Sequence, residues 1–173
     1  MLSGQIRDRL HVMLVLLAMS TAVPAEEVSE RWQKVGSATL SVLWFDIYDA
    51  SLYSLSGQFR GYDEPLLFQL DYKREISQKA LLEETEKQWS RYLPGSHPQK
   101  RWLSLLKKIW PEIRKGDQLA LELTSEGESN FYHNRMLIGV ITDQQFAPSF
   151  LQIWLSTESQ YPELAKQLRG EQR

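Results

Sequence analysis

The stretch FDIYDASLY, from Phe45 to Tyr53, carries polar side chains inside a region whose composition otherwise indicates β-strand. A strand with one wet face needs only alternation of apolar and polar residues, and here the alternation changes register near Tyr48 and Asp49. The break predicts either a turn or bulge between two strands, or polar side chains that line a site. The residues of this stretch leave both interpretations open.

The segments on either side extend the β pattern. Residues 37–47 alternate with apolar side chains on both faces, which predicts a first strand, and residues 50–56 predict a second. Glycine and proline then supply turn chemistry between residues 57 and 65. The run PLLFQLDYKR predicts a third strand, with these residues on one face: Leu66, Phe68, Leu70 and Tyr72.

The hydrophobic period then changes from two residues to about 3.6. Ser77 can cap a helix whose apolar side includes Leu81 and Trp89. A second helix is predicted to end before Pro111, and its apolar residues recur at helical spacing: Trp102, Leu105, Leu106, Ile109 and Trp110. The two helices are expected to form one helical layer.

Strands resume in DQLALELT, residues 117–124, where leucines alternate with polar residues, so one face of this strand is expected to meet water. SNFYHNRMLIGVIT predicts a hairpin that turns at Asn134 and Arg135, because Asn tolerates the left-handed conformation of such turns. QFAPSFLQIWLS and YPELAKQLRG predict two closing helices. Strands and helices in this order indicate an α+β fold with an antiparallel sheet.

The N-terminus has the layout of a secretory signal peptide. Arg7 and Arg9 precede the apolar run VMLVLLAMSTAV, and small residues in VPA predict cleavage after Ala25. A retained membrane anchor is the alternative, but the apolar core has roughly a dozen residues and a spanning helix needs about 20. The sequence therefore predicts residues 1–25 as a signal peptide, an exported protein, and no stable membrane span after cleavage.

The composition of the remaining chain limits its chemistry. Residues 1–25 contain two of the 20 basic and one of the 22 acidic residues, so the other 148 residues carry a net charge of −3 and predict one domain, 26–173. The charges are mixed rather than clustered, which argues against a nucleic-acid partner. The chain has no cysteine, so thiol nucleophiles and thiolate metal sites are excluded.

The remaining motifs indicate neither a metal nor a cofactor. His97 and His133 are the histidines beyond the predicted signal peptide, and they lack the spacing of metal ligands. His133 and its neighbour Tyr132 are predicted either to line a cleft or to face water. The sequence contains no nucleophile elbow, P-loop or dinucleotide-binding fingerprint.

The chain resembles the bacterial secreted chalcone isomerase-like proteins in the order of several of its segments. These segments are VGSATLSVLWFDIYDASLY, LDYKREIS, IWPEIRKGDQLALEL, FYHNRMLIGVI, FLQIWLS and YPEL, and the resemblance covers Lys34 to Gly170. It implies the open-faced β-sandwich of chalcone isomerase, a large antiparallel sheet with helices packed on one face and a ligand cleft between them. The predicted signal peptide, with cleavage after Ala25, gives the expected location as the periplasm.

The resemblance assigns a role to the opening stretch. Tyr48 falls where fatty-acid-binding members have a tyrosine that holds a carboxylate and where true isomerases have a threonine. Both groups have an arginine about a dozen residues upstream. Here Thr39 stands at that position and Gly36–Trp44 contains no basic residue. The departure argues against both isomerase chemistry and the clamping of a carboxylate, because a cation stabilises a phenolate or a carboxylate in a dry cleft.

Lys73 and Arg74, at the end of the third strand, are the candidates for a replacement cation, although residues at a strand end are often simply solvated. The predicted ligand-binding residues are Tyr48, Tyr72, Lys73 and Arg74, with no catalytic residue.

Three functions remain. The first is a non-catalytic binder of a fatty-acid-like or other amphipathic small molecule. The second is an isomerase or lyase that acts on a phenolic or enone substrate, with Tyr48 and Tyr72 as general acids, and the third is a cell-envelope interaction protein whose cleft is filled by side chains.

Overall fold

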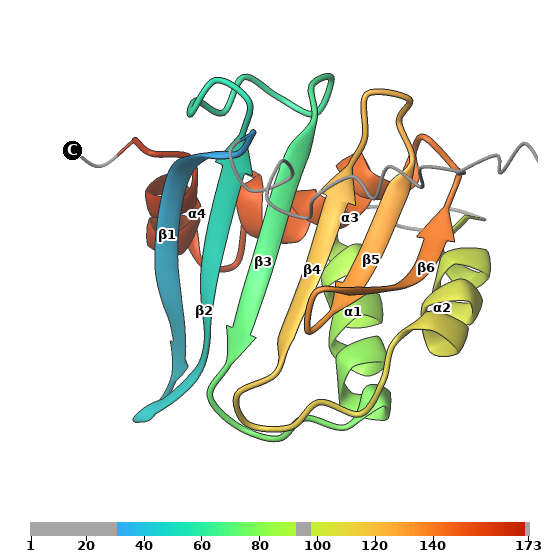
Figure 1. The fold of residues 1–173 in the computed structure, drawn as a ribbon. Helices are drawn as coiled ribbons and strands as arrows, with labels where there is room; N and C mark the ends of the chain where they lie inside the picture. The colour runs from blue at the N-terminus through green and yellow to red at the C-terminus, as the bar shows by residue number, and fades with distance from the viewer. Residues whose placement is uncertain (1–30, 93–97, 172–173) are drawn as a thin grey trace, which may run out of the picture.

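The computed structural model describes residues 31–92 and 98–171, so the predicted signal peptide lies outside the described residues. Six strands form one antiparallel sheet in which each strand pairs with the next along the chain (Figure 1). They are β1 (Gln33–Val42), β2 (Phe45–Ser54), β3 (Leu66–Tyr72), β4 (Gln118–Leu123), β5 (Ser129–His133) and β6 (Met136–Ile141). The predicted α+β fold with an antiparallel sheet is confirmed.

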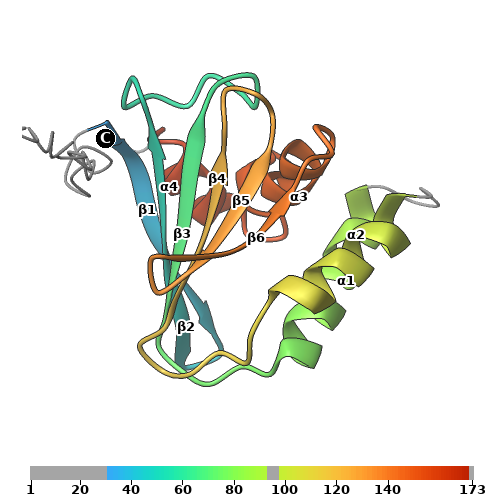
Figure 2. The same ribbon diagram turned by 45° about the vertical axis from the view of Figure 1, so that its right-hand side comes forward.

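Four helices lie on one side of this sheet. Between β3 and β4 come α1 (Gln78–Tyr92) and α2 (Pro98–Ile109), and after β6 come α3 (Phe146–Leu155) and α4 (Pro162–Leu168). Figures 1 and 2 show α3 and α4 behind the strands, with α1 and α2 paired toward the β6 edge. In the part of the chain that is described, no helix has the length and apolar character needed to cross a membrane.

Local sequence signals explain several element ends. The Ser77 hydroxyl accepts the backbone N–H of Ala80 at 3.2 Å, so Ser77 caps α1 as predicted. Pro162 begins α4, where its missing N–H costs no helical hydrogen bond. Asn134 and Arg135 both have positive φ, 50° and 70°, which confirms the predicted turn between β5 and β6.

The predicted boundary between the first two strands was wrong. The turn lies at Leu43 and Trp44, not at Tyr48 and Asp49, and β2 runs without interruption from Phe45 to Ser54. The change of alternation nevertheless has a structural cause. Leu40 pairs with Tyr48 and Ser41 pairs with Asp46, so Ile47 is a bulged residue.

The core fills the space between the sheet and the helices. Leu52, Phe68, Leu121 and Phe131 lie in one row across β2 to β5 and are all buried. The helices cover them with large aromatic side chains: Trp89, Trp102, Phe146 and Phe150. On α2, Trp102 and Leu106 are fully buried and Trp110 follows one turn later, whereas Leu105 and Ile109 are only partly buried.

The opposite face of the sheet carries mainly polar side chains, as expected of an open-faced sandwich. Tyr132 lies on this face, where its hydroxyl donates to Glu122 at 2.7 Å. The hydroxyl–carboxylate contact and burial raise the pKa of Tyr132 to about 12, with burial as the larger cause. Tyr132 therefore does not point into the space between the sheet and the helices.

Candidate ligand-binding site

The bulge at Ile47 sets the direction of Tyr48. Beyond the bulge, Tyr48 lies on the inner face of β2 and is buried against the helices. Its hydroxyl accepts the indole N–H of Trp154 on α3 at 2.8 Å. On the neighbouring strand, the ring of Tyr72 meets the Tyr48 ring edge to face, with centroids 5.7 Å apart. Two of the four predicted ligand-binding residues are therefore in direct contact.

The two tyrosines stay protonated because of their burial. Burial raises the pKa of Tyr72 far above its ordinary value, and it does the same for Tyr48 against the opposing hydrogen bond from Trp154. The Tyr48 hydroxyl is the acceptor in its bond with Trp154, so its own proton is available to a second group. The pair provides neutral hydrogen-bonding groups rather than a phenolate base.

A polar cluster lies beside Tyr48 between α1 and the segment that joins α3 to α4. The Gln88 amide nitrogen donates to Glu84 at 2.6 Å and to Gln160 at 2.8 Å, while its buried carbonyl oxygen has no partner among the described residues. Glu84 is close enough to Tyr48 for its charge to raise the pKa of that hydroxyl further. Tyr48 thus has a carboxylate nearby and a buried amide oxygen in the same region.

An aromatic layer continues from Tyr48 along the inner face. Trp154 packs on Phe68 and Phe150, with centroid distances of 4.9 and 5.1 Å, and Phe150 packs on Trp110 at 5.9 Å. The indole N–H of Trp110 is buried and has no hydrogen-bond partner in the described part of the chain. The layer therefore has an unpaired donor at the end farther from Tyr48, and leaving such a group unpaired costs about 1–3 kcal/mol.

Lys73 and Arg74 do not join the tyrosines. Lys73 lies on the open face of the sheet, where its ammonium group contacts Asp49 at 2.9 Å and Asp46 at 3.5 Å. The Arg74 guanidinium lies over the exposed ring of Phe45, 5.4 Å from its centroid. The two cations therefore lie apart from the buried tyrosine pair.

Thr39, where the resemblance led us to expect an arginine, also faces away from Tyr48. Its hydroxyl donates to Asp49 at 2.6 Å, and this bond is the largest cause of the lowered pKa of the Asp49 carboxyl. The side chain of Arg169 is largely enclosed, but Glu171 holds its guanidinium through two bonds of 2.6 and 2.9 Å. The buried polar residues of the described chain are all uncharged: Ser51, Ser54, Thr85, Gln88, Ser129 and Ser159.

His133 takes part in no metal site among the described residues. His97 lies outside the described residues, and His133 contacts Asp117 at 3.1 Å at the end of β5. Asp117 also accepts from Asn134 and from the backbone of Arg114, and these bonds lower the pKa of its carboxyl to about 2. Within residues 31–92 and 98–171, no three acidic or histidine side chains gather as metal ligands would.

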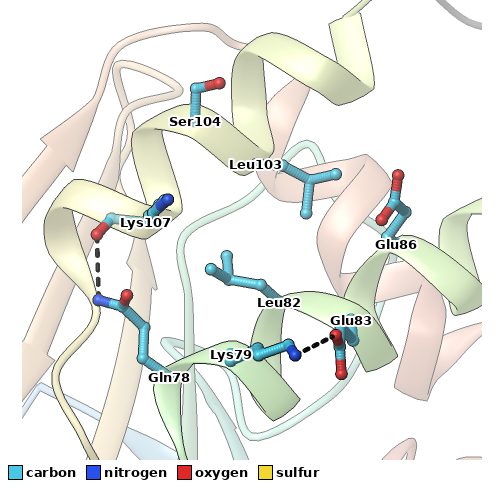
Figure 3. Close-up of a pocket in the computed structure, with 8 residues that line it drawn as sticks. All are labelled: Gln78, Lys79, Leu82, Glu83, Glu86, Leu103, Ser104 and Lys107. Carbon is cyan, nitrogen blue, oxygen red and sulfur yellow. Dashed lines mark hydrogen bonds and ion pairs between the residues drawn. The ribbon is translucent and has the colours of Figure 1, made fainter.

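Two surface hollows lie away from the tyrosine pair. One, of about 470 Å³, separates α1 from α2, and in Figure 3 Leu82 and Leu103 point into it between polar side chains on its rim. The other, of about 570 Å³, lies between α2 and β6 and includes Leu105 and Val140. Neither is lined by a residue that the sequence identified as ligand-binding.

Together, the open-faced antiparallel sheet, the helices on one face and the buried tyrosine pair beneath them define a chalcone isomerase fold. The chain belongs to the chalcone isomerase-like family, whose model matches residues 33–170. An uncharacterized protein of Haemophilus influenzae is 25% identical over 140 residues, which span 80% of this chain and 68% of that protein.

A solved structure confirms the fold. The crystal structure of an Arabidopsis thaliana fatty-acid binding protein superimposes with a TM-score of 0.62, covering 82% of this chain and 88% of that one. The two sequences are 12% identical, so the likeness concerns the fold. The roles of Tyr48, Tyr72, Lys73 and Arg74 in ligand binding stay predictions.

Proposed function

We propose that this protein is a non-catalytic binder of a fatty-acid-like or other amphipathic small molecule. The observation that carries the proposal is the buried Tyr48 hydroxyl, which holds a proton for an acceptor at one end of an aromatic layer. The apolar part of the ligand would lie along that layer toward Trp110. The fold shared with a fatty-acid binding protein supports this assignment.

The charges around Tyr48 favour a ligand whose polar end is uncharged. An ionised carboxylate in a dry site needs a cation or several donors. The charged side chain that acts on Tyr48 is Glu84, which is half exposed and paired with Lys87 at 3.2 Å, so it supplies no cation to the site. The site therefore suits a head group that accepts a hydrogen bond without a full negative charge, such as an ester, an amide or a protonated acid. A methyl ester is expected to bind at least as tightly as the corresponding ionised fatty acid.

A ligand must also find room in a layer that side chains already fill. The helix pair α1 and α2 meets the rest of the core through Trp89 and Trp102, which pack on Phe146. Their indole N–H groups also donate to the backbone of Ser149 at 3.0 Å and to Asp143 at 2.9 Å, so an outward movement would break these two bonds. We propose that this pair moves outward from the sheet when the ligand enters. The unpaired N–H of Trp110 would then donate to the ligand or to water that accompanies it.

An isomerase or lyase is the weaker candidate. General acid–base chemistry works best with a group whose pKa lies near the working pH. Burial raises the pKa of Tyr48 and of Tyr72, and so moves both further above that pH. Lys73, which could have supplied a stabilising cation, is paired with Asp46 and Asp49 on the other face. These groups favour binding over turnover.

Tyr48→Phe is expected to weaken ligand binding about 5- to 30-fold, because it removes one hydrogen bond worth about 1–2 kcal/mol. Titration with cis-parinaric acid and with its methyl ester measures this effect by fluorescence. The variant is also expected to unfold about 1–2 kcal/mol more readily, since the Trp154 N–H loses its acceptor. Stability alone therefore does not identify a binding role.

Two control variants separate binding from packing. Tyr53→Phe removes a hydroxyl from the opposite face of the same strand and should leave affinity within about twofold. Trp154→Phe breaks the same internal bond but keeps the Tyr48 hydroxyl, so affinity should fall less than in Tyr48→Phe. Equal affinities in wild type and Tyr48→Phe would remove Tyr48 from the binding site.

We further propose that the protein is exported to the periplasm after removal of residues 1–25. The proposal rests on the VPA sequence, which follows a short apolar run and is typical of a signal-peptide cleavage site. N-terminal sequencing of protein from the periplasmic fraction, detected through a C-terminal tag, is expected to begin at Glu26. Recovery of the uncleaved chain in the inner membrane at steady state would contradict the proposal.

A further inference from the structure

The turn between β1 and β2 exposes four consecutive apolar residues, Val42 to Phe45, here called the β1–β2 tip. Trp44 is 94% exposed, Leu43 85% and Phe45 60%. Single apolar residues on a surface are ordinary, but a contiguous group that includes a tryptophan indicates a contact surface. The tip lies at the lower left end of the sheet in Figure 1.

The backbone conformation of the tip does not require apolar residues at these positions. Leu43 has φ of +57°, a conformation that tight hairpin turns usually assign to Gly, Asn or Asp. The hairpin between β5 and β6 follows that preference with Asn134 at φ of +50°. The β1–β2 turn instead holds an apolar side chain outward at a position where a polar residue would fit the backbone better.

The charges next to the tip largely cancel. Lys73 is paired with Asp46 and Asp49, and the Arg74 guanidinium lies over the ring of Phe45. The tip is therefore a convex apolar end with a polar collar. Such an end suits the interfacial region of a bilayer, where tryptophan rings lie at the headgroup level and arginine extends toward the phosphates.

We propose that the β1–β2 tip inserts into the interfacial region of a lipid bilayer, mainly through apolar contact. A second step, which rests on the proposed function, is that the amphipathic ligand passes between bilayer and protein at this contact. Phe45 and Tyr48 are three residues apart on β2, roughly 10 Å at about 3.3 Å per residue. The tip and residue Tyr48 thus lie toward the same end of the strand.

Flotation with phosphatidylcholine vesicles tests the contact, using ligand-free full-length mature protein. The tip variant Leu43→Asn/Trp44→Ser should lower the partition coefficient at least tenfold. It should also fold, because Asn tolerates the positive φ at position 43, and melting curves check this. The control Leu55→Ser, at the other end of β2, should stay within twofold of wild type. Adding phosphatidylglycerol or 0.5 M NaCl should change wild-type partition less than threefold.

Several results would overturn the proposal. Wild-type protein that does not float with phosphatidylcholine, or a tip variant that floats equally well, would show that the tip is not a membrane contact. Binding that requires phosphatidylglycerol and disappears in salt would replace apolar insertion by charge attraction. A dimer that the tip variant alone converts to monomer in sedimentation, without vesicle binding, would make the tip an interface between copies of the chain.

The ligand step has its own readout. In solution the tip variant should bind cis-parinaric methyl ester with wild-type affinity, while the rate of transfer from vesicles should fall at least tenfold. Transfer at the wild-type rate would overturn the ligand step. If no ligand binds wild type but flotation still depends on the tip, the proposed function fails and the membrane contact stands.

Discussion

Leu106→Asp is expected to lower the free energy of unfolding by about 4 kcal/mol. Losses of this size are typical when a charge is buried without a partner. Leu106 is fully buried on α2, on the same side as Trp102 and Trp110. An aspartate there would either remain ionised among apolar groups or fold only when protonated. The midpoint of urea denaturation measures the loss.

Ser104→Asp is the matched control for this variant. Ser104 lies two residues away on the exposed side of the same helix, so the same charge is placed in water. Its effect on the free energy of unfolding should stay within about 0.5 kcal/mol. Similar midpoints for the two aspartate variants would show that the faces of α2 are assigned incorrectly.

Gly36→Ala is expected to destabilise the protein by about 3 kcal/mol, although it adds one methyl group. A Cβ atom at position 36 would lie 2.6 Å from the carbonyl oxygen of Leu168 and would also collide with the carbonyl of Gln167. Both carbonyls belong to α4, which packs directly on β1, so the helix would have to shift. Thermal or urea unfolding measures the loss.

The neighbouring substitution Ser37→Ala controls for the change of residue type in β1. Ser37 is exposed, and its replacement should change stability by no more than about 0.5 kcal/mol. If Gly36→Ala also unfolds like wild type, α4 does not approach β1 as closely as described. Replacement of Gly61, where an added Cβ would meet no atom within 4 Å, would report backbone strain alone.

Much of the fold was predictable because periodicity and turn chemistry are local. The change from a period of two to about 3.6 located the helices, and Asn134 marked one hairpin. The other hairpin was misplaced because Leu43 and Trp44 are apolar and resemble a continuing strand. The bulge at Ile47 then produced the break in alternation that suggested a turn.

The candidate site was only partly predictable. Tyr48 was identified through the family resemblance, but its partner Trp154 is 106 residues away, and a hydrogen bond across that separation leaves no local pattern. Gln88 precedes the buried Trp89 on α1, but its bond to Gln160 depends on how α3 and α4 are joined. Strand geometry could have predicted that Tyr72 and Lys73 lie on opposite faces of the sheet, because the side chains of adjacent residues on a strand point to opposite faces.

Extraction of purified mature protein followed by mass spectrometry tests the central claim most directly. We expect about one equivalent of an amphipathic molecule per protein, and a clearly smaller amount from Tyr48→Phe than from Tyr53→Phe. We also expect the molecule to be chemically unchanged after repeated binding and release. An empty protein that also fails to bind cis-parinaric acid or its methyl ester would contradict the account and indicate a filled, non-binding core. Steady conversion of an added ligand to a product would contradict it in the other direction, because the protein would then be an enzyme.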